Sequence, residues 1–296
     1  MKMIITADWH LRATRPRCRI DNDWMETQAN ALRQLLEISD EKDAPIMVVG
    51  DLFHSNSDTS FECINMVQKL ADYSGELYIL AGNHDLPYHS SENIDKSAIG
   101  VLLKSENIFK IEYFFENVIG FQNISYSASN FDEEDNKFAE IVFKHILTMP
   151  SKDKMEFVGD CETPESLLDK FPKAKWVFTG DYHHNFHYEK NGRHVINSGC
   201  LIRQVADMKD YQCGVYFVDT DENIVEFIPI IDNEQLIDDS YITKENEREN
   251  RIDDFVDKLK KTESISFDFI DNVEKEVQQN KFESELVDVI NELIGM

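Results

Sequence analysis

Short apolar runs alternate with longer amphipathic segments over roughly the first 230 residues. The runs at 2–7, 45–49 and 76–81 have the length of single strands, and 45–49 is continuously apolar, as in a strand buried on both faces. Residues 24–38 and 59–73 predict helices between these runs. The apolar positions of the first helix share one face: Ala31, Leu32, Leu35 and Leu36. This strand–helix–strand repetition predicts a layered α/β fold with right-handed crossovers.

The middle of the chain is less regular but continues the same alternation. We expect helices at 95–104 and 163–171, with Thr163 as the N-cap of the second. We expect strands at 108–115, 117–127, 140–147 and 175–179. Three further runs, at 194–199, 213–219 and 224–231, predict antiparallel strands joined around turn residues.

The composition changes after Ile231. Between 232 and 296 acidic residues outnumber basic ones by 19 to 8. Segments 243–261 and 272–294 are helix-like, and a strand candidate at 264–270 separates them. We therefore expect two domains, 1–231 and 232–296, the second a small α/β appendage that either caps the core or docks a partner. An apolar stripe at helical spacing is compatible with both interpretations: Leu286, Val289, Ile290 and Leu293.

The composition excludes several classes of protein. A hydrophobic content of 42%, with 11% aromatic residues, excludes a disordered acidic chain. No apolar run is long enough to cross a membrane, and the start, MKMIITADWH, lacks the pattern of a secretory leader. Five cysteines without a CxxC pair favour reduced thiols, and hence a cytoplasmic location, over disulfides or a structural zinc site.

The net charge constrains the partners. Thirty Lys+Arg against 57 Asp+Glu give −27, and a chain of that charge should be repelled by polyanions such as nucleic acids. A DNA-binding function therefore needs a local basic patch, bound cations or a basic partner. Four of the nine arginines lie within eight residues: Arg12, Arg15, Arg17 and Arg19. This loop either contacts phosphates and steers DNA, or is a solvated loop that offsets nearby acids.

Polar residues of metal-ligand type follow five of the predicted strands at their carboxyl ends. Loops that leave these strand ends form the binding sites of α/β sheets, so the side chains are expected to converge. Carboxylate, amide and imidazole groups without a thiolate favour Mn²⁺, with Mg²⁺ or Fe as alternatives. Seven candidates suit two ions with a bridging carboxylate: Asp8, His10, Asp51, Asn83, His145, Asp181 and His183. Two such ions serve phosphoester hydrolysis by stabilising the attacking and leaving oxygens.

The motifs around these residues resemble a known family. The calcineurin-like metallophosphoesterases have motifs similar to DWHL at 8–11, GDLFH at 50–54, GNHD at 82–85, His145 and GDYH at 180–183. The first three motifs most resemble the nuclease subunit of the SbcCD double-strand-break complex, including bacteriophage-encoded versions. The resemblance covers about residues 1–230, and it implies a four-layer α/β/β/α sandwich.

The resemblance also implies an activity and its partners. The expected function is a Mn²⁺-dependent DNA exonuclease and endonuclease that acts in DNA repair, recombination or degradation. We expect two Mn²⁺ ions, an SbcC-like SMC/ABC ATPase as partner, a homodimer, and the host cytoplasm as location if the chain is phage-encoded. Such an ATPase would clamp the DNA and so compensate for the acidity of this chain.

The family pattern implies which residues hold which ion. The first ion would be held by Asp8, His10, Asp51 and His183. The second would be held by the bridging Asp51 together with Asn83, His145 and Asp181. The common form of the last motif is Gly-His-x-His, whereas Asp181 stands here in place of the first histidine. His184 and His187 therefore offer alternative ligands in the same loop, and His145 could instead be a core histidine bound to the backbone.

The pattern also implies catalytic and DNA-binding roles. His84 would donate a proton to the leaving oxygen or stabilise the charge of the transition state, and Asp85 would orient its imidazole. His54 would help to position the phosphate, unless it is a plain loop residue. Arg203, which follows the turn Asn197-Ser198-Gly199, would reach the site as a further DNA contact.

Two other functions compete with the nuclease. The first is a phosphodiesterase or phosphatase that uses the same metals on nucleotides or other small molecules; the net acidity favours it. The second is a regulatory binding protein whose metal site is vestigial, against which the near-complete ligand set argues.

Overall fold

The computed structural model describes residues 1–56, 59–118, 126–129, 136–150, 161–231, 237–238, 240, 273, 277 and 287–289. The chain divides into two compact units, Met1–Asp238 and Asp239–Met296, so the first unit extends slightly beyond Ile231. The predicted elements at 243–261 and 264–270 lie outside the described residues. So does most of 272–294, where the described positions 273, 277 and 287–289 are helical. Of the apolar stripe, Val289 alone is described.

The first unit contains a six-stranded sheet with the order β11-β10-β1-β2-β3-β4. Its strands are β1 (Lys2–Thr6), β2 (Ile46–Val49), β3 (Leu77–Leu80), β4 (Ile108–Lys110), β10 (Gly214–Asp219) and β11 (Ile224–Pro229). Strands β1 to β4 are parallel, whereas β10 pairs antiparallel with both β1 and β11. The predicted strands at 2–7, 45–49 and 76–81 are thus confirmed as parallel neighbours.

A second, five-stranded sheet has the order β5-β6-β7-β9-β8. Its strands are β5 (Tyr126–Ser129), β6 (Ile141–His145), β7 (Trp176–Gly180), β9 (Arg193–Asn197) and β8 (Phe186–Lys190). All neighbours are parallel except β8, which pairs antiparallel with β9 at the edge. The carboxyl ends of β6 and β7 are therefore on the same side of this sheet, and their next residues form one edge of the site.

Four of the five α-helices among the described residues begin at side-chain caps that the sequence supplies, and α4 has none. They are α1 (Trp24–Lys42), α2 (Phe61–Ser74), α3 (Ala98–Leu102), α4 (Ile111–Tyr113) and α5 (Pro164–Lys170), with short helical turns at Pro87–His89, Ser91–Lys96, Phe114–Val118 and Ala206–Met208. Asp23 caps α1 and Ser60 caps α2 by accepting a backbone N–H. Thr163 caps α5 in a capping box with Ser166, which confirms the predicted N-cap.

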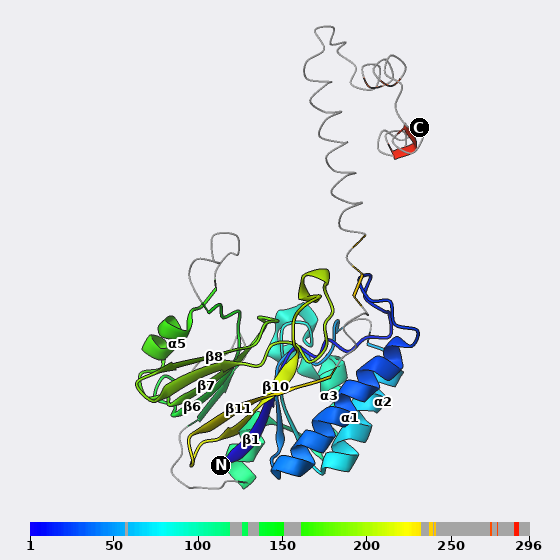
Figure 1. Cartoon of the computed structure of the whole chain (residues 1–296). Coiled ribbons are helices and arrows are strands. Elements are labelled where there is room, and N and C mark those ends of the chain that lie inside the picture. Colours follow the sequence, from blue (N-terminus) through cyan, green and yellow to red (C-terminus); the bar gives the residue numbers. More distant parts are fainter. Residues whose placement is uncertain are drawn as a thin grey trace, which may run out of the picture. The chain divides into compact units, whose positions relative to one another are not determined.

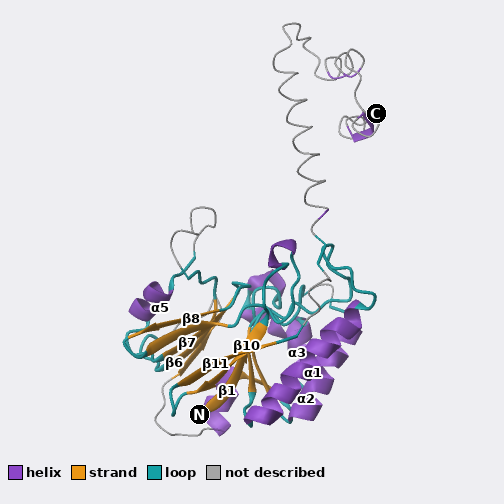
Figure 2. Cartoon of the chain, viewed as in Figure 1, coloured by secondary structure: helices purple, strands orange, loops and turns teal. Residues whose placement is uncertain are grey.

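Alternation along each strand builds four layers (Figures 1 and 2). Alternate residues of the first sheet face opposite ways. Ile4 and Val48 pack with α1 and α2, and Met3 and Val49 pack against the second sheet. The second sheet does the same: its inner face joins this middle core, and its outer face packs on α5. The four-layer α/β/β/α sandwich is confirmed. Each fully buried apolar side chain contributes about 1.5–3 kcal/mol.

The structure differs from the prediction at three elements. The predicted strand 108–115 ends at Lys110, and helical turns follow it. The run 194–199 is not a partner of 213–219, because β9 lies in the other sheet and is parallel to β7. The strand β8 was missed because it is an edge strand whose polar residues point to solvent, so it lacks an apolar run. Of the predicted strand 117–127, residues 119–125 lie outside the described part.

Candidate metal centre

The ends of five strands from both sheets bring the predicted ligands together. Two groups of side chains have ligand atoms within 4.8 Å of one another: Asp8 with His10 and His183, and Asp8 with Asp51 and His145. Asp8 belongs to both groups. His145 is the last residue of β6, and the others follow β1, β2 and β7, so each sheet supplies part of the cluster.

The backbone bends sharply where the ligands leave the strands. Asp8, His10, Asp51 and Asp181 have φ angles of 50°, 46°, 52° and 82°. Side chains other than glycine rarely adopt this left-handed region, although Asp and His do so more often than most, and each such residue costs about 1–3 kcal/mol. The cost is concentrated at the ligands, as expected where packing turns side chains toward a functional site.

Two motif glycines allow the backbone to approach the ligands. A Cβ atom at Gly50 would lie 2.0 Å from His145 Nδ1, and one at Gly82 would lie 2.1 Å from Asp51 Oδ1. Gly50 also has a φ of 90°. Any side chain at either position would displace a candidate ligand.

Hydrogen bonds to the backbone orient His145. Its Nδ1 donates to the Val49 carbonyl at 2.8 Å, and Nε2 points to Asn83 Oδ1 at 3.1 Å and Asp51 Oδ2 at 3.3 Å. His145 is thus bound to the backbone, as the simpler interpretation expected, and its second nitrogen still faces the candidate ligands. Asn83 joins the cluster through this contact.

The two carboxylates are held in place by backbone N–H groups. Asp8 accepts from Asp181 N with both oxygens, at 3.0 and 3.1 Å, and Asp51 Oδ1 accepts from His84 N at 2.9 Å. Asp181 itself is in neither group among the described residues, and its position is defined here by its backbone contact with Asp8.

The buried carboxylates of Asp8 and Asp51 favour the binding of cations. Burial raises the pKa of Asp8 well above its usual range, and the nearby Asp51 raises it further. Burial alone would also raise the pKa of Asp51, but the His145 imidazole lowers it overall. Burial lowers the pKa of His145, yet Asp51 and Asp8 raise it to about 10. Two carboxylates that are 0% and 1% exposed therefore lie together, and cations would relieve their repulsion.

The donor set fits two hard cations. The buried Asp51 Oδ2 accepts no hydrogen bond of good geometry among the described residues, and it lies 3.3 Å from His145 Nε2 and 3.7 Å from His10 Nε2. The Nε2 atoms of His10 and His183 face each other at 3.1 Å, as two ligands of a common ion would. Carboxylate oxygens, an amide oxygen and imidazole nitrogens are ligands suited to Mn²⁺, Mg²⁺ or Fe.

His84 and His54 lie beside this cluster. The Nδ1 atom of His84 donates to the carbonyl of His54 at 2.8 Å, and the His84 ring is 5.0 Å from that of His10, centroid to centroid. Arg12 Nη1 donates to His54 Nε2 at 2.8 Å. Burial, with the Arg12 charge, lowers the pKa of His54 to about 4.

Asp85 does not orient the His84 imidazole, which corrects the expected role. Its carboxylate accepts three backbone N–H groups, from Leu52 and Gly82 at Oδ2 and from Phe53 at Oδ1. Burial and the charge of Asp51 raise the pKa of Asp85 to about 7 against these donors. Asp85 thus ties the loop after β3 to the loop after β2.

Three polar side chains that the sequence analysis missed hold the ligand loops. Gln204 Nε2 donates to the carbonyls of Trp9 and His10, at 2.8 and 3.3 Å. Asn197 Nδ2 donates to the carbonyls on both sides of His183. Gln28 exchanges two hydrogen bonds with the backbone of Arg12, both at 3.0 Å. Gln28 is 0% exposed, and a polar residue on the apolar face of α1 was the signal available for it.

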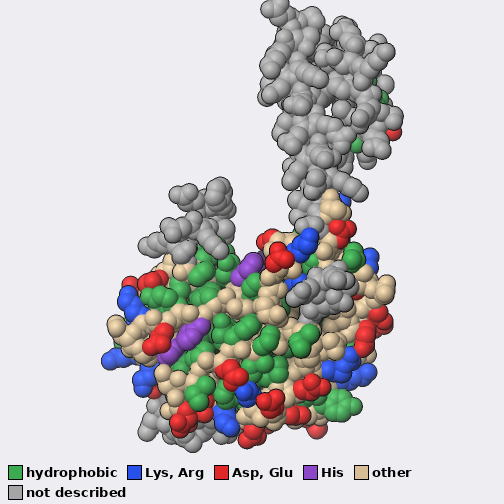
Figure 3. All heavy atoms as spheres, in the orientation of Figure 1, with side chains coloured by type: hydrophobic (Ala, Val, Ile, Leu, Met, Phe, Trp, Pro, Cys, Tyr) green, Lys and Arg blue, Asp and Glu red, His purple; other side chains and the backbone are tan. Residues whose placement is uncertain are grey.

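The arginine loop is divided between structural and exposed residues. Arg19 and Arg203 are 1% and 3% exposed, so neither can contact DNA as expected. Arg203 donates to the Lys209 carbonyl at 2.7 Å, and Arg19 forms a bidentate pair with Asp21, at 2.6 and 2.7 Å. Arg15 and Arg17 are exposed and Arg12 is half-buried. On the face seen in Figure 3, acidic and basic side chains are interspersed.

Replacing Arg19 by alanine should destabilise the first unit by about 3–5 kcal/mol, because Asp21 would remain buried without its partner. Arg17→Ala removes the same charge from an exposed position and should change the free energy of unfolding by less than about 0.5 kcal/mol. Urea unfolding of both variants measures the difference. Equal effects would contradict the structural role of Arg19.

The destabilisation caused by Arg19→Ala should also depend on pH. Burial raises the pKa of Asp21, but hydrogen bonds from Arg19 and Thr27 lower it overall. A lowered pKa in the folded state stabilises the fold above the unfolded value of about 3.9, and this contribution is lost as the pH falls through the folded value. The difference in the free energy of unfolding between Arg19→Ala and Arg17→Ala should therefore become smaller below about pH 4.

The alternative ligands His184 and His187 are placed elsewhere in the described structure. The His184 ring packs edge-on against Tyr211, with centroids 4.6 Å apart. His187 lies on β8, where its Nε2 meets His194 Nδ1 at 3.0 Å. Within the described part of the chain, neither belongs to a group of potential metal ligands.

The fold and the site define a metal-dependent phosphoesterase. The model of the calcineurin-like phosphoesterases matches residues 1–192, and the chain therefore belongs to this family. The family uses a dinuclear metal centre, in keeping with the two ligand groups that share Asp8. No curated protein matched the sequence.

The solved structures that the chain matches include three proteins of low sequence identity. A novel archaeal phosphodiesterase is 16% identical, with a TM-score of 0.39, and the match covers 77% of this chain and 99% of that one. A putative 5′-nucleotidase from Staphylococcus aureus is 13% identical (TM-score 0.45; 81% and 56% covered). The nuclease MPE of Pseudomonas putida is 12% identical (TM-score 0.31; 76% and 86% covered).

Among the described residues, no helix is long and apolar enough to span a membrane.

Proposed function

We propose that the chain is a Mn²⁺-dependent DNA exonuclease and endonuclease, the nuclease subunit of an SbcCD-like complex in DNA repair, recombination or degradation. The observation that carries this proposal is the position of His84. Its backbone N–H binds Asp51, and its ring lies beside His10 with His54 and Arg12 next to it. Hydrolysis of a phosphodiester needs cation ligands and a proton donor at one point, and these residues provide both.

The residues of the chain would divide the work as follows. When bound, two cations would lower the pKa of a water molecule and stabilise charge on the phosphate oxygens. The His54 carbonyl accepts from His84 Nδ1, so the second ring proton of the cationic form of His84, which would go to the leaving oxygen, would be held at Nε2. Arg12 donates to His54 Nε2, so the remaining proton of His54 is on Nδ1, where it can bind a phosphate oxygen.

The exposed arginines of the loop that follows His10 favour a polymeric substrate. Arg15 and Arg17 are exposed and follow closely after the ligand His10, and Arg12 is tied to His54 within the site. Phosphates along a DNA strand could contact these side chains while one phosphodiester lies at the metal centre. A single nucleotide would be too short to contact Arg12, Arg15 and Arg17 together.

A comparison of three substrates tests the proposal. Linear duplex DNA, a cyclic nucleotide and a bis-aryl phosphate are incubated with the full chain and Mn²⁺. We expect the highest kcat/KM for DNA, and we expect Arg15→Gln/Arg17→Gln to lower that value more than the value for the bis-aryl phosphate. The slope of log Kd for DNA against log salt concentration should fall by about two, one for each phosphate contact removed.

Two results would count against a nuclease. Hydrolysis of the small substrates without hydrolysis of DNA would favour the nucleotide phosphodiesterase or phosphatase. Equal losses on DNA and on the bis-aryl phosphate in the double variant would remove the arginines from substrate binding.

The proposal includes a partner and a location. A chain with a net charge of −27 needs a partner to hold DNA, and an SbcC-like SMC/ABC ATPase would serve as that partner. The complex would act in the cytoplasm, which is that of the host if the chain is phage-encoded. DNA affinity at several salt concentrations, measured with and without such an ATPase, tests this. The homodimer stays an expectation that sedimentation of the full chain would check.

A further inference from the structure

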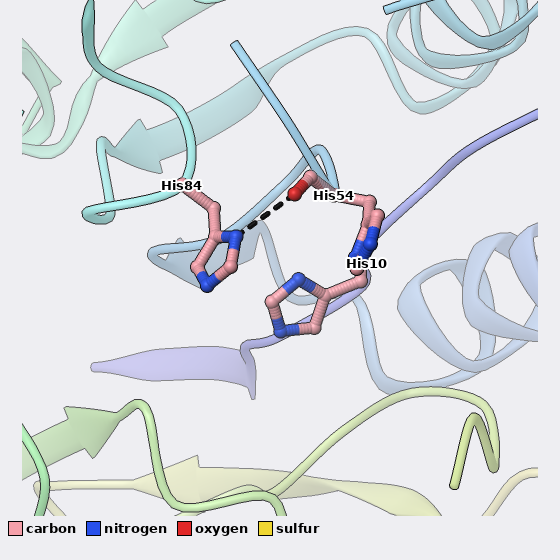
Figure 4. A group of neighbouring side chains, drawn as sticks. All are labelled: His10, His54 and His84. Carbon is pink, nitrogen blue, oxygen red and sulfur yellow. Dashed lines mark hydrogen bonds between the residues drawn. The ribbon is translucent and has the colours of Figure 1, made fainter. Parts of the chain in front are cut away.

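Three histidines form a further group of potential ligands beside the metal centre, with which the group shares His10. His10, His54 and His84 come from the loops after β1, β2 and β3, and each offers a ring nitrogen within 4.8 Å of the other two. The ring centroids are 5.0 Å apart for His10 and His84, 5.8 Å for His10 and His54, and 5.9 Å for His54 and His84. Figure 4 shows the three imidazoles gathered around one point.

Two of these rings have a nitrogen free to bind an ion. His10 is 4% exposed, and its Nδ1 is buried without a hydrogen-bond partner in the described part of the chain. A histidine that binds a metal through one nitrogen usually donates a hydrogen bond from the other, so this unpaired nitrogen is unusual. His84 donates from Nδ1 to a carbonyl, which leaves the lone pair of Nε2 available.

We propose that His10, His54 and His84 form a third cation site, which takes Zn²⁺ and inhibits the enzyme. Three imidazoles without a carboxylate suit a borderline-soft ion in tetrahedral geometry, with the fourth position open. The two groups at the metal centre each contain a carboxylate and suit harder ions. The three imidazoles therefore select Zn²⁺, and the two carboxylate-containing groups select harder ions such as Mn²⁺. Zinc at this site engages the residue that would donate the proton to the leaving oxygen, and activity is lost.

His10 couples this site to the metal centre. Its Nε2 faces His183 and Asp51, and its Nδ1 faces the histidine cluster. A neutral imidazole carries a single ring proton, so binding cations at both nitrogens requires the loss of that proton to water. Zinc at the third site therefore weakens the ion held by Asp8, His10 and His183.

Arg12 opposes zinc at the same site. Its Nη1 donates to His54 Nε2 at 2.8 Å, which places a positive charge beside a ligand and occupies the lone pair of that nitrogen. Zinc at His54 Nε2 requires the Arg12 side chain to withdraw, while the Arg12 backbone stays bound to Gln28 and Trp24. Replacing Arg12 by glutamine should therefore strengthen zinc binding, by about tenfold if about 1.4 kcal/mol of opposition is removed.

The test is a zinc titration of the full, Mn²⁺-loaded chain, followed by dialysis and metal analysis. Wild type should bind one Zn²⁺ and lose one Mn²⁺, and X-ray absorption at the zinc edge should show nitrogen ligands from three imidazoles. His54→Gln should weaken zinc binding by more than about tenfold, because one of the three imidazole ligands is lost, and loss of an outer hydrogen-bond partner alone costs about that much. His187→Gln, on the edge strand β8, is the matched control and should bind zinc as wild type does.

Three outcomes would overturn the inference. Zinc that is insensitive to His54→Gln and has carboxylate ligands has merely replaced manganese at the metal centre. Zinc lost in His187→Gln is held by the His187–His194 pair instead. Weaker zinc binding in Arg12→Gln would contradict the opposing role of Arg12. None of these measurements uses DNA, so they are independent of whether DNA is the substrate.

Discussion

The variant Asp51→Asn should hydrolyse phosphodiesters at least about 10²-fold more slowly than wild type, a loss of about 2.7 kcal/mol in transition-state stabilisation. Asp51 is 1% exposed, and its Oδ2 lies near both His145 and His10. Asparagine has the same size and keeps an oxygen to accept the His84 N–H, so the loop should stay in place. What it removes is the negative charge at the centre of the ligand cluster.

Metal binding can be measured separately from activity. A ligand that binds only the folded state at 100 times its Kd stabilises it by about 2.7 kcal/mol. Mn²⁺ should therefore raise the Tm of wild type, chelation should reverse this, and Asp51→Asn should lose most of the shift. Scanning calorimetry with and without Mn²⁺ checks it.

Asp85→Asn is the matched control for this experiment. Asp85 is another buried carboxylate, also 1% exposed, but it accepts backbone N–H groups from Leu52, Phe53 and Gly82. Its substitution should lower the Tm yet retain the upward shift with Mn²⁺. An Asp51→Asn variant with wild-type activity and the full Mn²⁺ shift would refute the assignment of the metal centre.

His84→Asn should lower kcat on DNA by about 10²–10⁴-fold, the usual contribution of a general acid. The asparagine amide can replace Nδ1 as the donor to the His54 carbonyl, but nothing replaces Nε2. The Mn²⁺-induced rise in Tm should persist, because His84 belongs to neither of the carboxylate-containing groups among the described residues.

The leaving group distinguishes the two roles considered for His84. A nitrophenolate leaves without protonation, so His84→Asn should slow the hydrolysis of a bis-nitrophenyl phosphate far less than that of DNA. If both substrates slow equally, His84 stabilises the charge of the transition state and is not the proton donor.

Much of the fold followed from periodicity. The helix expected at 24–38 is α1, because apolar residues at helical spacing bury one face on the first sheet whatever the loops do. A strand with apolar residues on both faces, such as β2, was predicted because it forms a continuous apolar run. The edge strand β8 was missed because three of its five residues are exposed, so no apolar run marks it.

The arginine loop shows where sequence reasoning failed. Nothing in the order of residues 12–19 distinguishes the four arginines, and a loop has no period from which burial could be derived. The structure buries Arg19 because Asp21 and the carbonyl of Arg203 satisfy its guanidinium, whereas Arg17 is left exposed. Likewise, Asp85 follows His84 directly, yet its carboxylate turns to the backbone of the neighbouring loop.

The amino-acid order alone predicted a layered α/β fold and the residues that gather at the edge of its sheets, because parallel strands between amphipathic helices bring their carboxyl ends together. The four-layer arrangement was implied by the resemblance of the motifs. Only the tertiary structure decided which atoms meet there. The left-handed turns at Asp8, His10 and Asp51, the unpaired Nδ1 of His10 and the contact of Arg12 with His54 depend on loops packed against one another from distant parts of the chain. Such contacts arise from packing in three dimensions, which no local pattern encodes.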